Sequence, residues 1–300
     1  MLRLLAHPPV VFAALLTLAA LLTLAPFLWA AFCPKSLQLA ARMPAWLRLL
    51  APAVLGFPYT LVAGSNGLFR WTWLAVYTLV PVLISVLLYR ASLADPEQRG
   101  DWRDLLILVF LGLAVDLRWF EPAWGLRLAI FNKILLLDAG IYGFLAIRQL
   151  GQVGFDLRLR LRDLRIGLVW LAAYAPIAAA LGLWLGFLHF HPLIPSARRV
   201  LLAWLFTCFF IAVPEELFFR GWMQNLLERR VGRVRALLIT SALFGLSHFN
   251  KRAAHFNGRY VLLATLAGIF YGIAWRQQRR IAASAITHAS VDTIWSVWLR

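Results

Sequence analysis

Acidic residues are scarce in this sequence, and charged residues of either sign are few. Only 13 residues are Asp or Glu, and all charged types together make up 14% of the chain. Apolar types reach 62%, well above the roughly 45–50% that is usual in soluble domains. The uncharged runs between the charges are long, which excludes an ordinary soluble domain. We predict an all-α protein, a polytopic bundle of transmembrane helices.

Cysteine is almost absent as well. The two cysteines, Cys33 and Cys208, both lie in apolar segments and form no Cys-x-x-Cys pattern. This excludes a disulfide framework and a cysteine-based metal site. We therefore interpret both side chains as ordinary buried residues.

The shortage of acids leaves a formal net charge of +17 and a pI near 11.3. Such an excess is typical of nucleic-acid-binding proteins, but none of their motifs accompanies it here. The arginines fall instead in short clusters between apolar runs, which is the positive-inside pattern of membrane proteins. We therefore predict a lipid bilayer as the surroundings and no nucleic acid as a partner.

Ten apolar segments predict about eight to ten membrane spans. They cover residues 9–33, 49–64, 71–89, 105–115, 126–147, 166–188, 200–227, 236–249, 260–275 and 281–299. The first holds 25 uncharged residues and exceeds the roughly 7–15 residues of a signal-peptide core, so we expect a retained helix. The second contains Pro52, Gly56 and Pro58 and is expected to be kinked or re-entrant.

The loops of the second half differ in charge. Twelve Lys and Arg residues lie in the loops 148–165, 229–235 and 276–280, against five in the two loops between them. The positive-inside rule therefore places these three loops in the cytoplasm. Within the first loop, apolar and polar residues alternate from Phe155 to Arg162, which fits either a strand or an interfacial segment.

Two adjacent carboxylates stand inside one of the apolar segments. Glu215 and Glu216 lie in the run 200–227, where inserting a carboxylate costs roughly 2.5–3.5 kcal/mol. Ionisable groups inside a membrane are therefore candidates for a functional site. Arg220 follows Glu216 at the i,i+4 spacing of a helix and is its predicted partner, whereas Glu215 needs another neighbour.

Three further polar side chains lie in later apolar segments. His248, His288 and Asp292 fall at depths that overlap with the depth of Glu215, so we predict that the four groups meet at one buried site. A carboxylate beside an imidazole can deprotonate a water molecule for attack on a carbonyl. A second histidine, with an acid one turn further on, could stabilise the oxyanion that develops.

Two versions of this chemistry stay open. A water molecule activated by a glutamate needs no cofactor, whereas Glu215, His248, His288 and Asp292 are also acceptable tetrahedral ligands for zinc. No serine or cysteine is placed as an evident nucleophile, and no His-Glu-x-x-His motif is present. A proton-coupled transporter, which would use the carboxylates as a relay, is an alternative function.

Three short patterns lie in order on successive apolar segments. Glu215-Glu-Leu-Phe-Phe-Arg220 fits Glu-Glu-x-x-x-Arg, Phe244-Gly-Leu-Ser-His248 fits Phe-x-x-x-His, and His288-Ala-Ser-Val-Asp292 fits His-x-x-x-Asn/Asp. Together they resemble the motifs of the CAAX-protease and bacteriocin-processing (CPBP) family of intramembrane proteases. The resemblance covers roughly residues 155–298.

This resemblance implies an all-helical endopeptidase of a bacterial cytoplasmic membrane that cuts near the C-terminus of a membrane-associated peptide or protein. It implies that Glu215 and His248 activate water, and that His288 and Asp292 stabilise the oxyanion. The supporting residues would be Glu216, Arg220 and Phe244.

The same resemblance divides the chain into N-terminal helices of unassigned role, residues 1–148, and a protease core, residues 149–300. Family membership also allows an alternative. A catalytically silent relative would act by binding, in bacteriocin immunity or in regulation.

Overall fold

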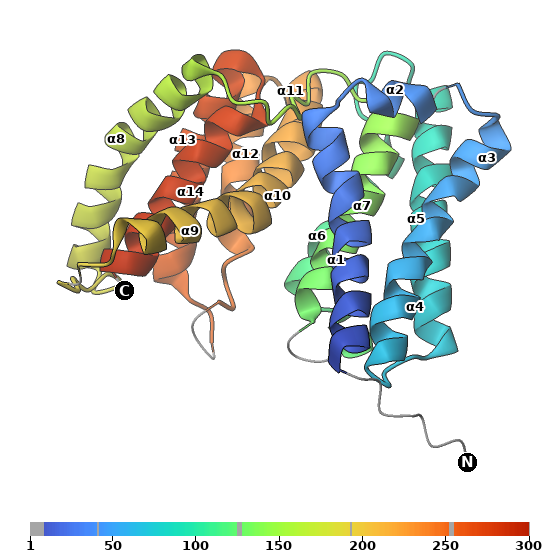
Figure 1. The fold of residues 1–300 in the computed structure, drawn as a ribbon. Coiled ribbons are helices and arrows are strands. Elements are labelled where there is room, and N and C mark those ends of the chain that lie inside the picture. Colours follow the sequence, from blue (N-terminus) through green and yellow to red (C-terminus); the bar gives the residue numbers. More distant parts are fainter. Residues whose placement is uncertain (1–8, 41, 125–127, 193, 252–254, 300) are drawn as a thin grey trace. The chain divides into compact units, whose positions relative to one another are not determined.

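The computed structural model describes residues 9–40, 42–124, 128–192, 194–251 and 255–299. The protein is 78% helical, and the described residues contain no strand, which confirms the predicted all-α class. The chain divides into two compact units, Met1–Gly151 and Gln152–Arg300 (Figure 1). The roles assigned to residues 1–148 and 149–300 stay predictions.

Each of the ten apolar segments predicted from the sequence is helical over most of its described residues. Among the described residues, six helical stretches are long and apolar enough to cross a membrane, which makes this an integral membrane protein. The six are Ala45–Ser65, Trp71–Ala94, Ile130–Ile147, Leu161–Trp184, Ala197–Val231 and Gly258–Gln278. Of the other predicted spans, residues 105–115 and 236–249 lie mostly in helices of only 15 and 14 residues, and the last span carries the polar side chains of His288 and Asp292.

The first unit is a helical bundle. Its elements are α1 (Pro9–Phe32), α2 (Ser36–Ala40), α3 (Ala45–Leu50), η1 (Ala51–Leu55), α4 (Gly56–Ser65), α5 (Trp71–Ala94), α6 (Trp102–Asp116), η2 (Glu121–Ala123), α7 (Ala129–Ile141) and η3 (Tyr142–Ile147). The 3₁₀ turn η1 interrupts the helix between α3 and α4, as the prolines and glycine of this segment predict. Tyr59 is completely buried, and its ring stacks on Tyr77 and meets the edge of Trp124.

A buried ion pair fixes one end of this unit. The Nε atom of Arg148 lies 3.0 Å from Oδ1 of Asp104, and its Nη2 lies 2.7 Å from Oδ2 of Asp95. The side chains of Arg148 and Asp104 are almost completely buried. Because a buried charge is costly without its partner, this pair holds the residue after η3 against the start of α6.

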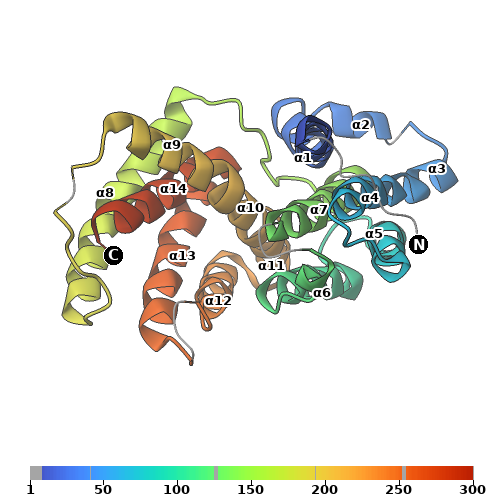
Figure 2. The same ribbon diagram turned by 60° about the horizontal axis from the view of Figure 1, so that its bottom comes forward.

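The second unit contains the candidate site. Its elements are α8 (Leu161–Trp184), α9 (Ala197–Thr207), η4 (Cys208–Ala212), α10 (Val213–Glu216), η5 (Leu217–Gln224), α11 (Asn225–Val231), α12 (Arg233–Leu246), α13 (Gly258–Gln278) and α14 (Ile281–Trp298). Helix α14 lies at the centre, in contact with α8, α9, α10 and α13 (Figure 2). The alternating residues before α8 form neither helix nor strand up to Arg160, so the strand interpretation of that segment is wrong.

The helical stretch that carries the two glutamates is irregular. Residues 197–231 run on as one apolar helical stretch, but η4 and η5 are π-helical turns on either side of α10. Pro214 stands at the start of α10 and cannot donate a backbone hydrogen bond to the preceding turn, which accounts for a break in the regular pattern there. Such π-turns are frequent at functional sites.

Candidate active site

Helix α14 presents the site residues His288 and Asp292 from the middle of the second unit. All residues from Ile281 to Ala289 are buried, and most of them are alanine, serine or threonine. Small side chains allow neighbouring helices to approach closely. The neighbouring helices therefore enclose His288, which is only 2% exposed.

Three carboxylates surround the His288 ring. Its Nδ1 lies 2.9 Å from Oε1 of Glu216. Its Nε2 lies 3.5 Å from Oδ2 of Asp292 and 3.9 Å from Oε2 of Glu215. Ionised carboxylates only accept hydrogen bonds, so this geometry suits a ring that carries an N–H group on each nitrogen.

Glu216 also pairs with Arg220. The Nε atom of Arg220 lies 3.2 Å from Oε2 of Glu216, and both side chains are completely buried. Arg220 donates a hydrogen bond of 3.1 Å from Nη2 to the carbonyl of Gly268 on α13. Its guanidinium carbon lies 4.6 Å from the centre of the Phe244 ring. A single carboxylate thus joins α14, through His288, to the helix that carries Arg220.

The two glutamates differ in exposure. The side chain of Glu216 is 0% exposed, whereas that of Glu215 is 27% exposed. Asp292 is similarly open, with a side chain that is 29% exposed. Glu215 and Asp292 are therefore the carboxylates that a substrate or a water molecule can reach, and Glu216 is committed to its protein partners.

His248 stands just beyond the end of α12. Its Nδ1 lies 2.8 Å from the backbone carbonyl of Phe244 and 3.1 Å from Oγ of Ser247. A carbonyl oxygen can only accept, so Nδ1 carries the hydrogen of the neutral ring, and Nε2 is the nitrogen that can accept a proton. The ring packs between Phe244 and Tyr260, with centroid distances of 5.0 and 4.7 Å.

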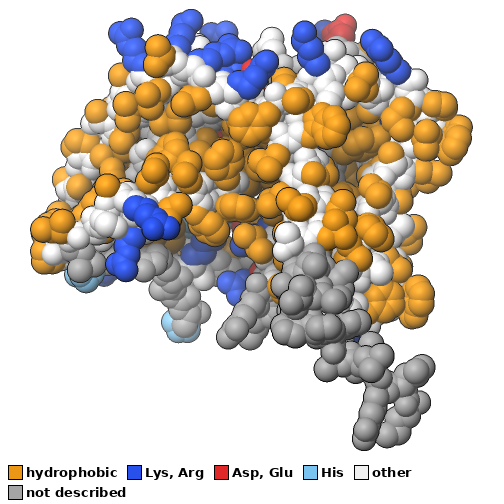
Figure 3. Space-filling view, viewed as in Figure 1, with side chains coloured by type: hydrophobic (Ala, Val, Ile, Leu, Met, Phe, Trp, Pro, Cys, Tyr) orange, Lys and Arg blue, Asp and Glu red, His pale blue; other side chains and the backbone are white. Residues whose placement is uncertain are grey.

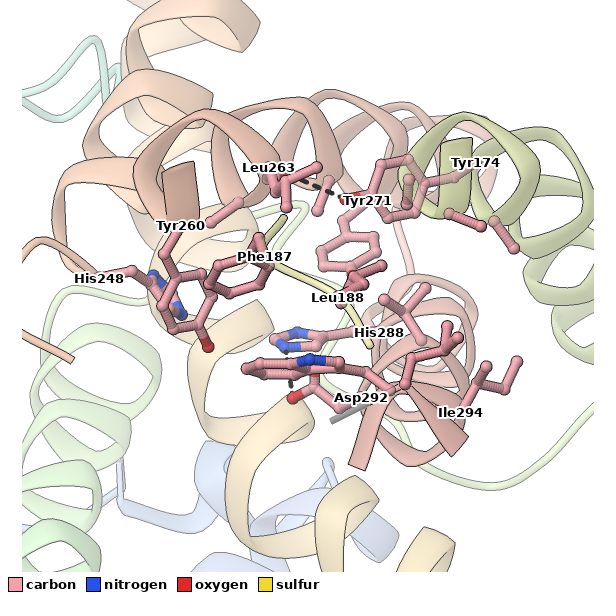
Figure 4. Close-up of a pocket in the computed structure, with 18 of the residues that line it drawn as sticks. Tyr174, Phe187, Leu188, His248, Tyr260, Leu263, Tyr271, His288, Asp292 and Ile294 are labelled. Atoms are coloured by element: carbon pink, nitrogen blue, oxygen red, sulfur yellow. Dashed lines mark hydrogen bonds and ion pairs between the residues drawn. The ribbon is translucent and has the colours of Figure 1, made fainter. Parts of the chain in front are cut away.

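One cavity of about 80 Å³ reaches both histidines. Its walls come mainly from α8, α13 and α14, and they are largely aromatic and aliphatic. Figure 4 shows His288 beside Asp292 in this cavity, and His248 beside Tyr260. A cavity of this size holds several water molecules. Its lining includes Tyr174, Phe187, Leu188, Phe244, His248, Tyr260, Leu263, Tyr271, His288, Val291, Asp292 and Trp295.

The structure brings most of the predicted site residues together around His288. Glu215, Glu216 and Asp292 all lie within 4 Å of its ring nitrogens, and Arg220 joins them through Glu216. Phe244 packs against both histidines, with ring-centroid distances of 5.0 Å to His248 and 5.6 Å to His288. His248 shares the cavity, and its own hydrogen bonds go to residues of its own turn.

The arrangement does not fit a zinc site formed by Glu215, His248, His288 and Asp292. Zinc ligands lie about 2.0–2.2 Å from the metal. In the part of the chain that the structure describes, no group of three or more His, Cys, Asp or Glu residues is arranged to hold a metal ion.

Tyr271 is a site residue that sequence reasoning missed. Its ring stacks on His288 at a centroid distance of 4.6 Å and an angle of 18°, and it is 1% exposed. The guanidinium carbon of Arg220 lies 5.5 Å from the centre of the same ring. The sequence signal is weak. It consists of a tyrosine between Gly268 and Gly272 in an otherwise apolar run.

Replacing Tyr271 by leucine is expected to lower the kcat of any reaction at this site about 2–10-fold, with little change in KM. The stacked ring fixes the orientation of His288, and leucine removes the flat surface. Tyr271→Phe retains that surface and should restore most of the activity. If the leucine and phenylalanine variants behave alike in steady-state kinetics, the ring does not act by orienting His288.

Residues 197–294 match a family model described as Type II CAAX prenyl endopeptidase Rce1-like. The match includes all three motifs and covers about a third of the chain, less than the predicted range 155–298. It confirms the resemblance to CAAX-type intramembrane proteases. Comparisons with curated proteins and with solved structures gave no match.

Proposed function

We propose that this protein is an intramembrane endopeptidase in which Glu215 and His248 activate a water molecule. The observation that carries the proposal is the difference in burial and in partners between the two adjacent glutamates. Glu216 is buried between Arg220 and His288, whereas Glu215 is partly exposed beside the same histidine. Both glutamates lie within the segment that matches the family model of CAAX prenyl endopeptidases.

In the proposed reaction, the water molecule lies between the Glu215 carboxylate and Nε2 of His248. Glu215 removes one proton from it, and the oxygen attacks the carbonyl carbon of the substrate peptide bond. The protonated Glu215 then gives that proton to the departing amine nitrogen as the C–N bond breaks. Nε2 of His248 accepts a hydrogen bond from the water during this transfer.

The negative charge on the carbonyl oxygen needs a stabilising group. His288 supplies positive charge from a buried, fixed position, and its Nε2–H, which lies 3.5 Å from Asp292, is the N–H group that can donate to the oxyanion, because Nδ1–H is held by Glu216 at 2.9 Å. An ionised Asp292 cannot donate a hydrogen bond, so we assign it the role of orienting His288 through Nε2. Phe244, Tyr271 and Arg220 keep the histidine and Glu216 in place.

The substrate is a peptide that reaches the site from the bilayer. The apolar walls of the cavity favour an apolar segment of that peptide over a charged one. We place the protein in a bacterial cytoplasmic membrane, with cleavage near the C-terminus of the substrate. The N-terminal helices, residues 1–148, have no assigned step in this reaction.

The direct test is cleavage of a prenylated peptide that ends in a CAAX sequence by the purified full-length protein in detergent. Mass spectrometry should show one released C-terminal fragment, and incorporation of one ¹⁸O atom from labelled water should follow from direct attack by water. An unprenylated peptide of the same sequence serves as the comparison. Absence of cleavage with a set of such peptides, by folded protein, would favour the silent relative.

Removal of metal ions is expected to leave cleavage unchanged within a factor of about two, because the proposed general base needs no metal. The protein should be treated with a chelator, analysed for bound metals and assayed before and after zinc is restored. Loss of activity on chelation with recovery on zinc addition would contradict the metal-independent reaction.

A further inference from the structure

Three turns at one end of the second unit form a single surface. They are the segment before and at the start of α8, the α11–α12 turn and the α13–α14 turn. Arg276 donates a hydrogen bond to the carbonyl of Arg233, and Arg280 donates one to the carbonyl of Arg158. The backbone N–H of Ile281 donates to the carbonyl of Gly154 at 3.0 Å. These bonds connect all three turns.

This surface, which we name the arginine end, carries a large excess of positive charge. The chain has eleven arginines and three acidic residues within the ranges 153–165, 228–235 and 276–280. The arginines are Arg158, Arg160, Arg162, Arg165, Arg229, Arg230, Arg233, Arg235, Arg276, Arg279 and Arg280. The acids are Asp156, Asp163 and Glu228, which leaves eight uncompensated positive charges.

All three acids are already used inside the protein. Asp163 lies 2.8 Å from Nε of Arg280, and Asp156 lies 3.0 Å from its Nη1. Glu228 pairs with Arg276 and Arg279. Hydrogen bonds from Arg158 and Arg280 hold the pKa of Asp156 well below its usual value, so it remains charged in these pairs at neutral pH.

Five arginines of the arginine end are exposed and have no ion-pair partner among the described residues. They are Arg162, Arg165, Arg230, Arg233 and Arg235. Because the three acids of this surface are all paired, anions that meet these arginines must come from outside this surface. Guanidinium groups bind phosphate oxygens with two parallel hydrogen bonds, which makes phosphate a well-matched anion.

Exposed apolar side chains alternate with these arginines. Leu159 is 68% exposed and Leu161 is 86% exposed, and Val234, between Arg233 and Arg235, is 68% exposed. Figure 3 shows lysine and arginine side chains along the upper edge of this unit, above a broad hydrophobic band. Interleaved cations and apolar groups at such a boundary are typical of segments that lie in the headgroup region of a bilayer.

We propose that the arginine end binds the headgroups of anionic phospholipids. The five exposed arginines contact the phosphates, while Leu159, Leu161 and Val234 enter the adjoining acyl region. Membrane topology alone would require positive charge on this side but not exposed apolar residues between the charges. The inference is independent of the proteolytic reaction, because none of these residues lines the cavity.

The test compares lipid binding by the full-length protein and two sets of variants in detergent micelles. Native mass spectrometry measures the retention of phosphatidylglycerol against phosphatidylcholine. The five-site variant, with glutamine at Arg162, Arg165, Arg230, Arg233 and Arg235, is expected to lose about tenfold or more of the preference for phosphatidylglycerol. The matching five-site lysine variant should retain much of it, and Arg198→Gln with Arg199→Gln, at the start of α9, should retain all of it.

Three further measurements distinguish lipid binding from misfolding of the variant and from binding of a soluble anion. Wild-type preference should fall as salt rises, because ions screen exposed charges. Thermal unfolding without anionic lipid should be the same for wild-type and five-site glutamine protein, which shows that the variant is folded. Equal phosphatidylglycerol retention by these two proteins would overturn the proposal. Inorganic phosphate, added at the same concentration as the lipid, should not displace phosphatidylglycerol. Complete displacement would also overturn the proposal, in favour of a site for a soluble anion.

Discussion

Glu215→Gln is expected to lower the kcat/KM for peptide cleavage by about 10²–10⁴ while the protein remains folded. Glutamine has nearly the same volume as glutamate but cannot take a proton from water. The Glu215 side chain is 27% exposed, and its Oε2 lies 3.9 Å from Nε2 of His288, so the change removes little buried structure. The measurement is kcat/KM on the peptide that wild-type protein cleaves, with thermal unfolding recorded on the same sample.

His248→Ala should reduce cleavage to a similar degree, and the double variant should be scarcely worse than either single one. Groups that act as a unit in one step give losses that do not add. Multiplied losses in the double variant would mean that Glu215 and His248 act in separate steps. Ser247→Ala is the matched control, because Ser247 touches the same imidazole through Nδ1 and has no proposed part in proton transfer.

A folded Glu215→Gln protein that cleaves at the wild-type rate would show that the catalytic assignment is wrong. The alternatives give other results. A silent relative would retain its biological effect after the change, and wild-type protein would show no cleavage. A transporter would lose proton-coupled flux in Glu215→Gln, again with no cleavage by the wild-type protein.

The helices of this fold follow from the sequence with little ambiguity. A run of about 20 uncharged residues matches the thickness of the hydrocarbon layer, and only a helix satisfies its backbone there. The interruptions within the helices are harder to predict from the sequence. The π-turns around α10 depend on how the stretch 197–231 packs around α14, and Pro214 marks only one position in it.

Contacts in the site were predictable to the extent that they are local. The spacing of Glu216 and Arg220 is visible in the sequence, because one helical turn separates them. The contact between Glu216 and His288 spans 72 positions, and no local pattern encodes such a distance. The sequence analysis paired Glu216 with Arg220 alone and placed Glu215 beside the histidines, so it missed this contact. Tyr271 was missed because an aromatic ring in an apolar helix has an ordinary explanation as a packing residue.

The arginine end is also only partly readable from the sequence. The number of Lys and Arg residues in each loop identifies the three loops of the arginine end. It does not show which of these arginines form ion pairs within the protein. Arg280 forms an ion pair with Asp163, which lies 117 positions away in the sequence. Its guanidinium group is therefore occupied within the protein and is not available to an external anion. The exposed arginines are distinguished only when these pairs are known.

Glu216→Gln is expected to act on folding, in contrast to Glu215→Gln. The change leaves Arg220 charged, completely buried and without its ionic partner, and it leaves one acceptor oxygen where Glu216 has two, so the side chain can no longer accept from both Arg220 and His288. Breaking a buried ion pair in this way costs about 3–5 kcal/mol, so we expect low yield and a lowered Tm. Arg220→Ala should do the same, since it leaves Glu216 without that cation.

Two comparisons test whether the charge pair is the cause. The double variant with Glu216→Gln and Arg220→Met removes both charges, so it should be more stable than either single variant, because no unpaired ion remains buried. Glu228→Gln is the matched control. The Glu228 side chain is 4% exposed, but its partners Arg276 and Arg279 are 21% and 25% exposed and can turn towards water, so the loss of stability should be smaller than in Glu216→Gln. Equal losses of Tm in Glu216→Gln and Glu228→Gln would contradict the assignment of Glu216 as the residue that holds Arg220 and His288 together.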